Sequence, residues 1–242
     1  MKIKETKIKE IVNWIREEVK KANAKGVCIA ISGGIDSAVC AVLAKIAFPK
    51  NTEGIFLNIN SSDEAHNNFK LIVDKFKINH QLINLENSFN AFLKDLNISG
   101  NNNLLIEGNI KARLRMNALY AYANMKDYLV IGTSNYSEMY LGYFTKWGDG
   151  AADIYPIAKF KKSEIYQLGL LLKLPTKILK QKPSADLWCG QTDEKELGFK
   201  YEDLERYWQN DPNLDKKISS KIIACHKNSE HKRIKNLNCF DK

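Results

Sequence analysis

The chain has 242 residues, 44% of them hydrophobic and 27% charged, which is the balance of a soluble globular protein with one substantial core. No apolar run is long enough to cross a bilayer, and the first twenty residues are too charged for a secretory signal, so we expect a cytoplasmic protein without a membrane partner. The net charge of +9 is compatible with nucleic acid, a membrane surface or anionic small molecules, but no recognised nucleic-acid motif accompanies it, and we expect no nucleic-acid partner.

The first third of the chain alternates helices with short apolar strands. Apolar residues recur at helical spacing in residues 3–24 and predict an amphipathic helix. Strands are expected at residues 27–31, 53–59 and 80–84, with helices at residues 37–47 and from Asp63, the expected N-cap. This order predicts a mostly parallel sheet flanked by helices on both faces, which is a doubly wound α/β fold.

The rest of the chain combines longer helices with irregular stretches. Residues 97–103 (NISGNNN) form a polar loop that is a candidate for mobility. The remaining elements are expected as helices at residues 86–95, 104–125 and 161–173, a strand at 128–133, irregular stretches up to Asp153 and over 181–192, and two C-terminal helices. Because no repeat, linker or low-complexity tract divides the sequence, we expect a single domain over residues 1–242.

The sharpest motif is SGGIDS at residues 32–37, directly between the first strand and the following helix. Gly33 and Gly34 allow a sharp turn that brings backbone N–H groups against an anion, and the positive end of the helix points to the same place. A Walker A loop would continue with Lys-Ser/Thr, whereas here Asp36 follows the glycines. A carboxylate beside phosphates implies a bridging divalent cation, expected to be Mg²⁺. The alternative is a tight turn with a helix-capping aspartate.

This loop resembles that of the N-type ATP pyrophosphatases (the PP-loop superfamily), which grip the β,γ-pyrophosphate and leave the α-phosphate open to attack. Beyond it the sequence reads NIKARLRM (109–116), GTSNYSEMYLGYFTKWGDGAADIYPI (132–157), KPSADLWCGQTDEKELG (182–198) and SEHKR (229–233). These segments are similar to those of the bacterial NAD synthetase family in their residues, order and spacing. The resemblance implies an adenine nucleotide alpha hydrolase-like, Rossmann-like fold. It also implies an ammonia-dependent ligase that converts deamido-NAD to NAD through an adenylated carboxylate, releasing AMP and pyrophosphate in the last step of NAD biosynthesis.

The resemblance also implies roles for individual residues. Asp36 and Lys162 are the implied catalytic residues, and Asp36 and Glu138 are the implied ligands of Mg²⁺. The residues implied to contact ATP are Ile29, Ala30, Ile31, Ser32, Gly33, Gly34, Ile35, Asp36, Ser37, Thr133, Lys162 and Ser184. Those implied to contact deamido-NAD are Arg113, Lys146, Asp153, His231 and Lys232. Family members are homodimers with the dinucleotide near the interface, so the implied partners are ATP, deamido-NAD, ammonia and a second copy of the chain.

Several of these residues also have a plain structural interpretation. The alternatives are a surface charge at Arg113, a helix cap at Glu138, a strand end at Thr133, and Lys161 in the role of Lys162. The aromatic residues Tyr143, Phe144 and Trp147 could stack on the pyridine ring or pack, and we favour packing for two of the three. Ile35 stands where the family often has Gln, at a position whose side chain need not touch phosphate.

The number of residues before the first strand indicates which nitrogen donor the protein uses. Only about 25 residues precede the first strand, too few for a glutaminase domain, so we expect ammonia itself to be the donor unless a separate subunit supplies it. Two other functions stay open. A tRNA-modifying PP-loop enzyme would explain the basic charge, but its sulfur-transferring members need paired catalytic cysteines that are absent here. A non-catalytic nucleotide-binding protein would not need the set of Asp36, Glu138 and Lys162.

Overall fold

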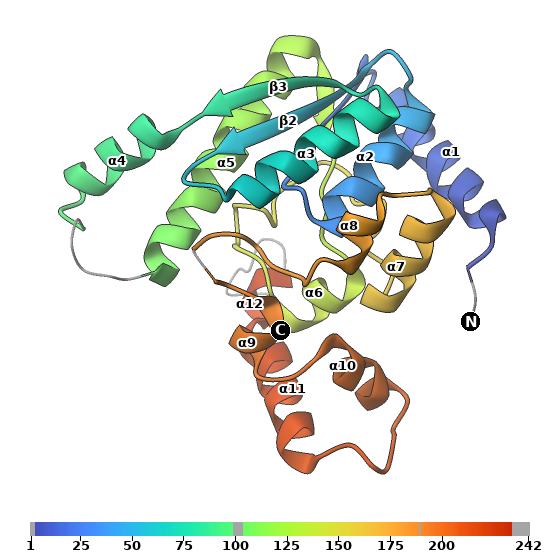
Figure 1. Cartoon of the computed structure of the whole chain (residues 1–242), viewed down its shortest axis with the longest axis vertical. Coiled ribbons are helices and arrows are strands. Elements are labelled where there is room, and N and C mark those ends of the chain that lie inside the picture. The colour runs from blue at the N-terminus through green and yellow to red at the C-terminus, as the bar shows by residue number, and fades with distance from the viewer. Residues whose placement is uncertain (1–2, 99–103, 189, 234–242) are drawn as a thin grey trace, which may run out of the picture.

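The computed structural model describes residues 3–98, 104–188 and 190–233. Its sheet is built from the strands β1 (Gly26–Ala30), β2 (Thr52–Asn58), β3 (Asn79–Asn84) and β4 (Tyr128–Val130). They lie in the order β3-β2-β1-β4, and each neighbouring pair is parallel. All four carboxyl ends therefore meet at one edge of the sheet, where open α/β folds bind their ligands (Figure 1). The predicted doubly wound α/β fold is confirmed.

Helices cover both faces of this sheet (Figure 1). One face carries α1 (Glu5–Lys21), α2 (Ile35–Ala47), α3 (Asp63–Phe76) and α7 (Lys162–Leu171), whose apolar residues share one buried cluster. The other face is covered by α5 (Leu104–Lys126), which contributes to a second cluster with the strands. The helix α4 (Glu86–Asp95) follows β3 and reaches beyond the sheet edge.

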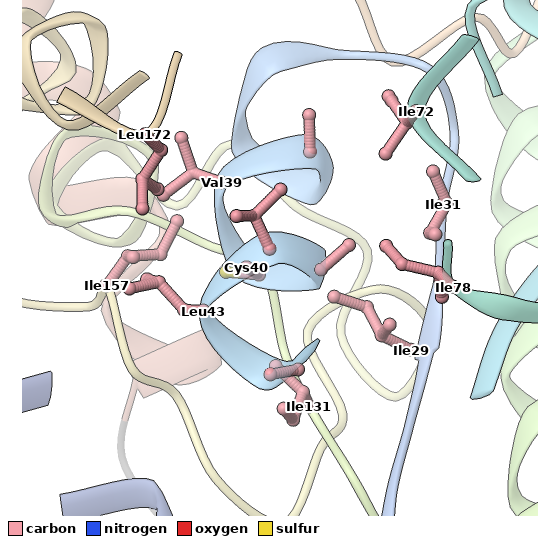
Figure 2. Packing of buried hydrophobic residues seen from close by; sticks show 14 of the residues in the cluster. Ile29, Ile31, Val39, Cys40, Leu43, Ile72, Ile78, Ile131, Ile157 and Leu172 are labelled. Atoms are coloured by element: carbon pink, nitrogen blue, oxygen red, sulfur yellow. The ribbon is translucent and has the colours of Figure 1, made fainter. Parts of the chain in front are cut away.

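The core explains why β1 and α2 are held rigidly. Successive residues of β1 point to opposite faces, so Ile29 belongs to the first cluster and Cys28 to the second. Helix α2 lies in the middle of the first cluster and is buried on nearly every side. Figure 2 shows Val39 and Leu43 of this helix facing Ile157 and other apolar side chains. The segment between β1 and α2 therefore projects from the most rigid part of the molecule.

The C-terminal half adds a helical lobe to this body. Its elements are α6 (Tyr136–Leu141), α9 (Asp193–Leu197), α10 (Tyr201–Trp208), α11 (Lys216–Asn228) and α12 (Glu230–Arg233). The helix α8 (Thr176–Lys180) belongs to the body, because its Ile178 lies in the first cluster. The helices α10 and α11 project from the body (Figure 1) and have a small core of their own. Leu141 of α6 joins Leu204 and Ile222 in that core, so the lobe is attached through α6.

Details of the expected elements are corrected by the structure. The N-cap of α3 is Ser62, whose hydroxyl accepts the Ala65 amide at 3.2 Å, and not Asp63. The strand β4 ends at Val130, three residues before the expected end, and continues only as an isolated bridge. Four helices follow residue 192 within the described residues in place of the two expected, because α9 and α12 are too short to show a period in the sequence.

The expected polar loop and the expected lack of a membrane-spanning helix can be compared with the structure only over the described residues. Of the polar loop expected at residues 97–103, residues 99–103 lie outside the described part of the chain. Within the described residues, none of the helices combines the length and the apolar character needed to traverse a membrane.

Candidate active site

Residues 32–37 form a tight turn between the carboxyl end of β1 and the start of α2, which we call the cradle. Gly33 has φ of 88°, in the left-handed region, and a Cβ there would lie 2.7 Å from the carbonyl oxygen of Ala65 in α3. A glycine is therefore required both for the backbone angle and for the close approach of α3. The hydroxyls of Ser32 and Ser37 lie 3.2 Å apart across the turn, which braces it.

The start of α2 faces the same cradle. Its N-cap is Gly34, which offers no side-chain hydrogen bond, so the first N–H groups of this 13-residue helix are left for a ligand. Ile35 is buried in the core, in agreement with a side chain that does not touch phosphate. The side chains of Ile29 and Ile31 are buried as well, so contacts of these residues with ATP would be made by the backbone. The contacts themselves stay predictions.

Three charged residues from separate helices meet beside the cradle. The ammonium nitrogen of Lys162 lies 2.6 Å from Oδ2 of Asp36 and 3.0 Å from Oε1 of Glu138. Asp36 belongs to the first turn of α2, Glu138 to α6 and Lys162 to the first turn of α7. The structure thus brings together the two implied metal ligands and the implied phosphate-binding lysine. We call these three residues the ion triad.

Helix α6 positions Glu138 through a capping box. Asn135 caps the helix by accepting the Glu138 amide at 3.0 Å, and Oε2 of Glu138 accepts the Asn135 amide at 3.2 Å. Glu138 therefore caps α6 with one oxygen and binds Lys162 with the other, so the structural and the functional interpretation are compatible. The side-chain amide of Asn135 also donates to Oδ1 of Asp36 at 2.8 Å.

Electrostatics keeps Lys162 charged in this buried place. Burial alone lowers the pKa of Lys162, which is 3% exposed, but the carboxylates of Asp36 and Glu138 outweigh that effect and raise its pKa. Burial also raises the pKa of Glu138, against the opposing effect of Lys162. Removing Lys162 would leave two buried carboxylates without a cation. Lys161 turns away, with its ammonium 5.3 Å from the ring of Trp208, so Lys162 is the lysine in the site.

The two other residues implied to contact ATP are Thr133 and Ser184. Thr133 follows β4, the neighbour of β1, and is half-buried at the same sheet edge. Ser184 belongs to the irregular segment at residues 181–192, where its hydroxyl donates to the carbonyl of Gln191 at 2.7 Å. As predicted, the described residues of this segment, 181–188 and 190–192, form no helix or strand, and their hydrogen bonds fold the segment back on itself.

The segment at residues 181–192 is tied to both faces of the body. On the α3 side, the Ser62 hydroxyl lies 3.2 Å from Oδ2 of Asp186. On the α5 side, the ammonium of Lys111 donates to the carbonyl of Leu187 at 2.7 Å. Lys111 is itself buried, and burial lowers its pKa. The segment therefore spans the carboxyl ends of the strands as a strap.

Four of the five residues implied to contact deamido-NAD gather around residues 142–147. Arg113 donates to the carbonyl of Lys146 at 3.3 Å, and the Lys146 ammonium donates to the carbonyl of His231 at 2.7 Å. The Lys232 ammonium donates to the carbonyls of Gly142 and Phe144 at 2.8 and 2.7 Å. The C-terminal tail thereby comes beside α5. The ammonium groups bond backbone carbonyls, which an anionic ligand could replace.

Asp153 stands apart from that group. Its carboxylate accepts the backbone amide of Val130 at 2.7 Å and the hydroxyl of Tyr120 at 3.1 Å, so it holds the end of β4 against α5. A contact with the dinucleotide stays a prediction. Among the three aromatic candidates, Trp147 is 59% exposed, while Tyr143 and Phe144 are half-buried.

Three residues beside the ion triad were not singled out from the sequence. Asn135 could have been found, since Asn135 and Glu138 have the spacing of a capping box. Asp193 and Tyr201 carry no such signal: Asp193 opens a five-residue helix and is 4% exposed. The Tyr201 hydroxyl donates to Asp193 at 2.9 Å, and the Lys162 ammonium lies 5.1 Å from the centre of the Tyr201 ring.

The comparison with known proteins agrees with this geometry. The family model described as NAD synthase matches residues 7–237. The chain is 39% identical to the NH(3)-dependent NAD(+) synthetase of Mycoplasma pneumoniae, covering 93% of this chain and 91% of that protein. The structure of the NMN synthetase of Francisella tularensis is similar with a TM-score of 0.91 and 38% identity, covering 97% of this chain and 98% of that one. The structure of the NH3-dependent NAD synthetase of Campylobacter jejuni, solved with nitrate ion, is similar with a TM-score of 0.81 and 30% identity. This match covers 96% of this chain and 97% of that one.

Proposed function

The chain belongs to the NAD synthase family, and from that premise we propose that it amidates deamido-NAD with ammonia at the expense of ATP. It is a ligase, and the products are NAD, AMP and pyrophosphate. The observation that carries this function is the ion triad beside a glycine turn with free N–H groups. This arrangement suits a reaction in which pyrophosphate leaves from ATP. The tRNA-modifying alternative is not favoured by the comparisons.

We further propose that Asp36 and Glu138 hold Mg²⁺ while ATP is bound. The two carboxylates come from different helices, α2 and α6, and already converge on one cation, the Lys162 ammonium. Within the described residues no three or more His, Cys, Asp or Glu side chains are grouped so that they could hold a metal ion by themselves. Phosphate oxygens and water would therefore complete the coordination, as is usual for Mg²⁺. When bound, the ion neutralises charge on the phosphates. Lys162, displaced from the carboxylates, would then turn to the phosphate oxygens.

In the first step the chain's own groups orient ATP and stabilise the leaving group. The N–H groups at the start of α2 bind the β- and γ-phosphates and leave the α-phosphate open. A carboxylate oxygen of the nicotinate forms a bond to the α-phosphorus while the bond to the β-phosphate oxygen breaks, and pyrophosphate takes the electron pair. Lys162 offsets the charge that develops on that oxygen. No protein nucleophile is needed, and catalysis is by positioning and electrostatics.

In the second step ammonia attacks the carbonyl carbon of the adenylate. The C–N bond forms, the C–O bond to AMP breaks, and AMP leaves with the electron pair while protons pass to solvent. Incubation with deamido-NAD, ATP, Mg²⁺ and ammonium should give NAD, AMP and pyrophosphate in equal amounts. Formation of ADP and phosphate, or unchanged turnover in Asp36→Asn, would contradict the proposal.

A second candidate substrate is the mononucleotide, with amidation of the same carboxylate. The observation that favours it is the likeness in fold and sequence to a protein named NMN synthetase. Both substrates carry the nicotinate that the ion triad serves, and they differ in the adenylate half. Comparing kcat/KM for deamido-NAD and for nicotinate mononucleotide under the same conditions decides between them, and a tenfold or larger preference identifies the substrate.

We also propose that the chain acts as a homodimer. Large apolar side chains are exposed next to one another in sequence at the start of α5, where Leu104 is 50% and Leu105 is 65% exposed. Exposed apolar groups of this kind favour association with a partner surface. Sedimentation of the wild type and of Leu105→Glu tests this proposal, since a monomeric wild type would contradict it. The cytoplasmic location stays a prediction.

A further inference from the structure

Helix α6 joins the ion triad to the C-terminal lobe. Glu138 lies in its first turn and binds the Lys162 ammonium at 3.0 Å, while Leu141, its last residue, is buried in the core of the lobe. The helix has only six residues, and at a rise of about 1.5 Å per residue it is about 9 Å long. The position of its carboxyl end therefore bears directly on the position of the Glu138 carboxylate.

The carboxyl end of α6 is closed by side chains from a distant part of the chain. The last four carbonyls of an α-helix have no partner inside the helix. At α6 two of them accept the amides of Gly142 and Tyr143, in the manner of helices that end on a glycine in the left-handed region. The other two, those of Tyr140 and Leu141, are contacted by side chains of residues 226–233, which we call the tail segment.

Arg233 is at the centre of this contact. Its Nη1 donates to the Tyr140 carbonyl at 3.2 Å and to the Ser229 hydroxyl at 2.7 Å, and its Nη2 donates to the carbonyl of His226. The Ser229 hydroxyl oxygen in turn lies 3.1 Å from the carbonyl oxygen of Leu141. A planar guanidinium fixes several donor directions at once, which a lysine cannot do. Arg233 therefore binds the end of α6 to the end of α11.

The two backbones meet closely at this contact. Gly142, the residue after α6, has φ of 66°, and a Cβ there would lie 2.0 Å from Cβ of Ser229. The His226 ring stacks on the Tyr140 ring with 4.0 Å between their centres, and its Nδ1 lies 2.8 Å from the Tyr140 carbonyl oxygen. The tail segment is therefore packed against the end of α6, and a shift of one moves the other.

The residue before Arg233 belongs to the second-substrate group of the proposed function. Lys232 is implied to contact deamido-NAD, and its ammonium donates to the Gly142 carbonyl at 2.8 Å. The guanidinium of Arg233 instead bonds α6 and the tail segment itself. Neighbouring residues thus have different tasks, and that of Arg233 concerns the helix that carries Glu138.

We propose that Arg233 is a positioning residue for Glu138, an inference that rests on the proposed function. By fixing the carboxyl end of α6, Arg233 holds the Glu138 carboxylate where, together with Asp36, it would bind the divalent cation of the nucleotide. Without Arg233 the Tyr140 carbonyl loses a charge-assisted hydrogen bond, and α6 is free to shift away from Asp36. Docking of the tail segment and binding of the cation then favour each other, as linkage requires.

The first test measures the binding of Mn²⁺ together with α,β-methylene-ATP, which cannot be cleaved at the reacting bond, by electron paramagnetic resonance of the ion. Arg233→Met should weaken this binding by about fivefold or more. Arg233→Lys, which keeps the charge but not the planar fork, should lose less. In EDTA the affinity for α,β-methylene-ATP alone, measured by equilibrium dialysis, should stay within about twofold of wild type, because the N–H groups of α2 bind phosphates without Glu138.

The matched control is Arg206→Met. Arg206 lies on α10 of the same lobe and donates to Asp211 at 2.8 Å, so its loss should leave both affinities unchanged. The proposal is overturned if Arg233→Met binds Mn²⁺ and the analogue as wild type does, and a raised KM for deamido-NAD in that variant would then assign Arg233 to the second substrate. An equal loss of affinity with and without the cation would also overturn it, because that result indicates a general distortion of the site.

A second measurement uses the wild type and does not depend on the folding of a variant. Amide hydrogen exchange in the tail segment should slow when Mg²⁺ and α,β-methylene-ATP are added together, and less when the analogue is added in EDTA. Exchange that is the same with and without the cation would overturn the proposal. None of these measurements requires amidation. If the wild type forms no NAD from ammonium, the proposed function fails, whereas wild-type affinity in Arg233→Met removes only the positioning role.

Discussion

Asn135 and Asp36 are 99 residues apart in the chain and are joined by a hydrogen bond of 2.8 Å from the amide nitrogen of Asn135 to Oδ1 of Asp36. Because Lys162 takes Oδ2, both oxygens of Asp36 have fixed partners. The cap of α6 therefore also sets the orientation of the Asp36 carboxylate beside the cradle. Asn135 is fully buried, so water does not replace the bond.

Replacing Asn135 separates its two roles. Asn135→Ala removes the cap and the bond to Asp36, and should lower the free energy of unfolding by about 1–2 kcal/mol and reduce kcat. Asn135→Ser restores a good cap but cannot reach Asp36, so stability should recover in part while kcat stays low. Urea denaturation and steady-state rates measure the two effects. Wild-type kcat in Asn135→Ser would contradict the positioning role.

Replacing Lys162 should affect stability and activity together. Lys162→Met leaves Asp36 and Glu138 buried without a cation, which should cost about 3–5 kcal/mol in the presence of EDTA, and less when Mg²⁺ is added. The rate of pyrophosphate release should fall by about 100-fold or more. Lys161→Met is the control, because Lys161 faces Trp208, and it should change stability by less than about 0.5 kcal/mol. Equal effects of the two substitutions would refute the assignment.

Substitution by alanine should affect stability differently at Gly33 and at Gly34, the two glycines of the cradle. Gly33→Ala forces a residue with a side chain into φ of 88° and against the carbonyl of Ala65, so stability should fall by about 1–3 kcal/mol. Gly34 has an ordinary φ of −81°, and the nearest atom to its Cβ would be the Ser32 hydroxyl at 3.5 Å. Gly34→Ala should therefore fold normally. Thermal unfolding compares them, and equal midpoints would show that the turn is not strained.

The N-cap of α3 was expected at Asp63 and lies at Ser62, and substitutions at these two residues test the difference. Ser62→Ala should lower stability by about 1 kcal/mol, since it removes the cap and the contact with Asp186. Asp63→Asn should have a smaller effect, because Asp63 contributes only its charge to the first turn. A larger loss in Asp63→Asn, measured by chemical denaturation, would restore the original expectation of an Asp63 cap.

Stability should fall at alkaline pH partly because of Cys28. Burial raises the pKa of this thiol to about 12 from the ordinary value of 9.0, so the folded state keeps a proton that the unfolded state loses. The stabilising contribution is complete below pH 9 and is lost as the pH rises towards 12. The slope of unfolding free energy against pH over that range should be smaller in Cys28→Ala. An identical slope would mean that the thiol ionises freely in the folded protein.

The sequence predicted the first half of the fold well for a physical reason. Each strand there is short and followed by a regular helix, and β1 and β2 are apolar and buried, so period and turn signals agree. The cap of α3 was assigned one residue late, because Ser62 and Asp63 are both good caps and only the backbone angles decide between them. The short helices α8, α9 and α12 have too few residues for a period to show.

Site residues that belong to contiguous sequence motifs could be predicted from the sequence. Residues that come close to the site only in the folded chain could not. Asp36, Glu138 and Lys162 were found through their segments, and their distances in the structure bring them together. Asp193 and Tyr201 were missed, because their importance depends on contacts with Lys162 across the lobe. No spacing in the sequence encodes that contact.

The enclosure of α2 by the core has a consequence for how substrates are accommodated. The end of this helix at which we propose that ATP binds is held in place by the core before any ligand arrives, so little conformational entropy would be lost on nucleotide binding. By contrast, the Lys146 ammonium donates to the carbonyl of His231 in the tail, and the Lys232 ammonium donates to the carbonyl of Gly142 outside it. Under the proposed function these two lysines would exchange such bonds for bonds to the second substrate. Selectivity for that substrate can therefore diverge through changes at these two lysines while the phosphate chemistry remains intact.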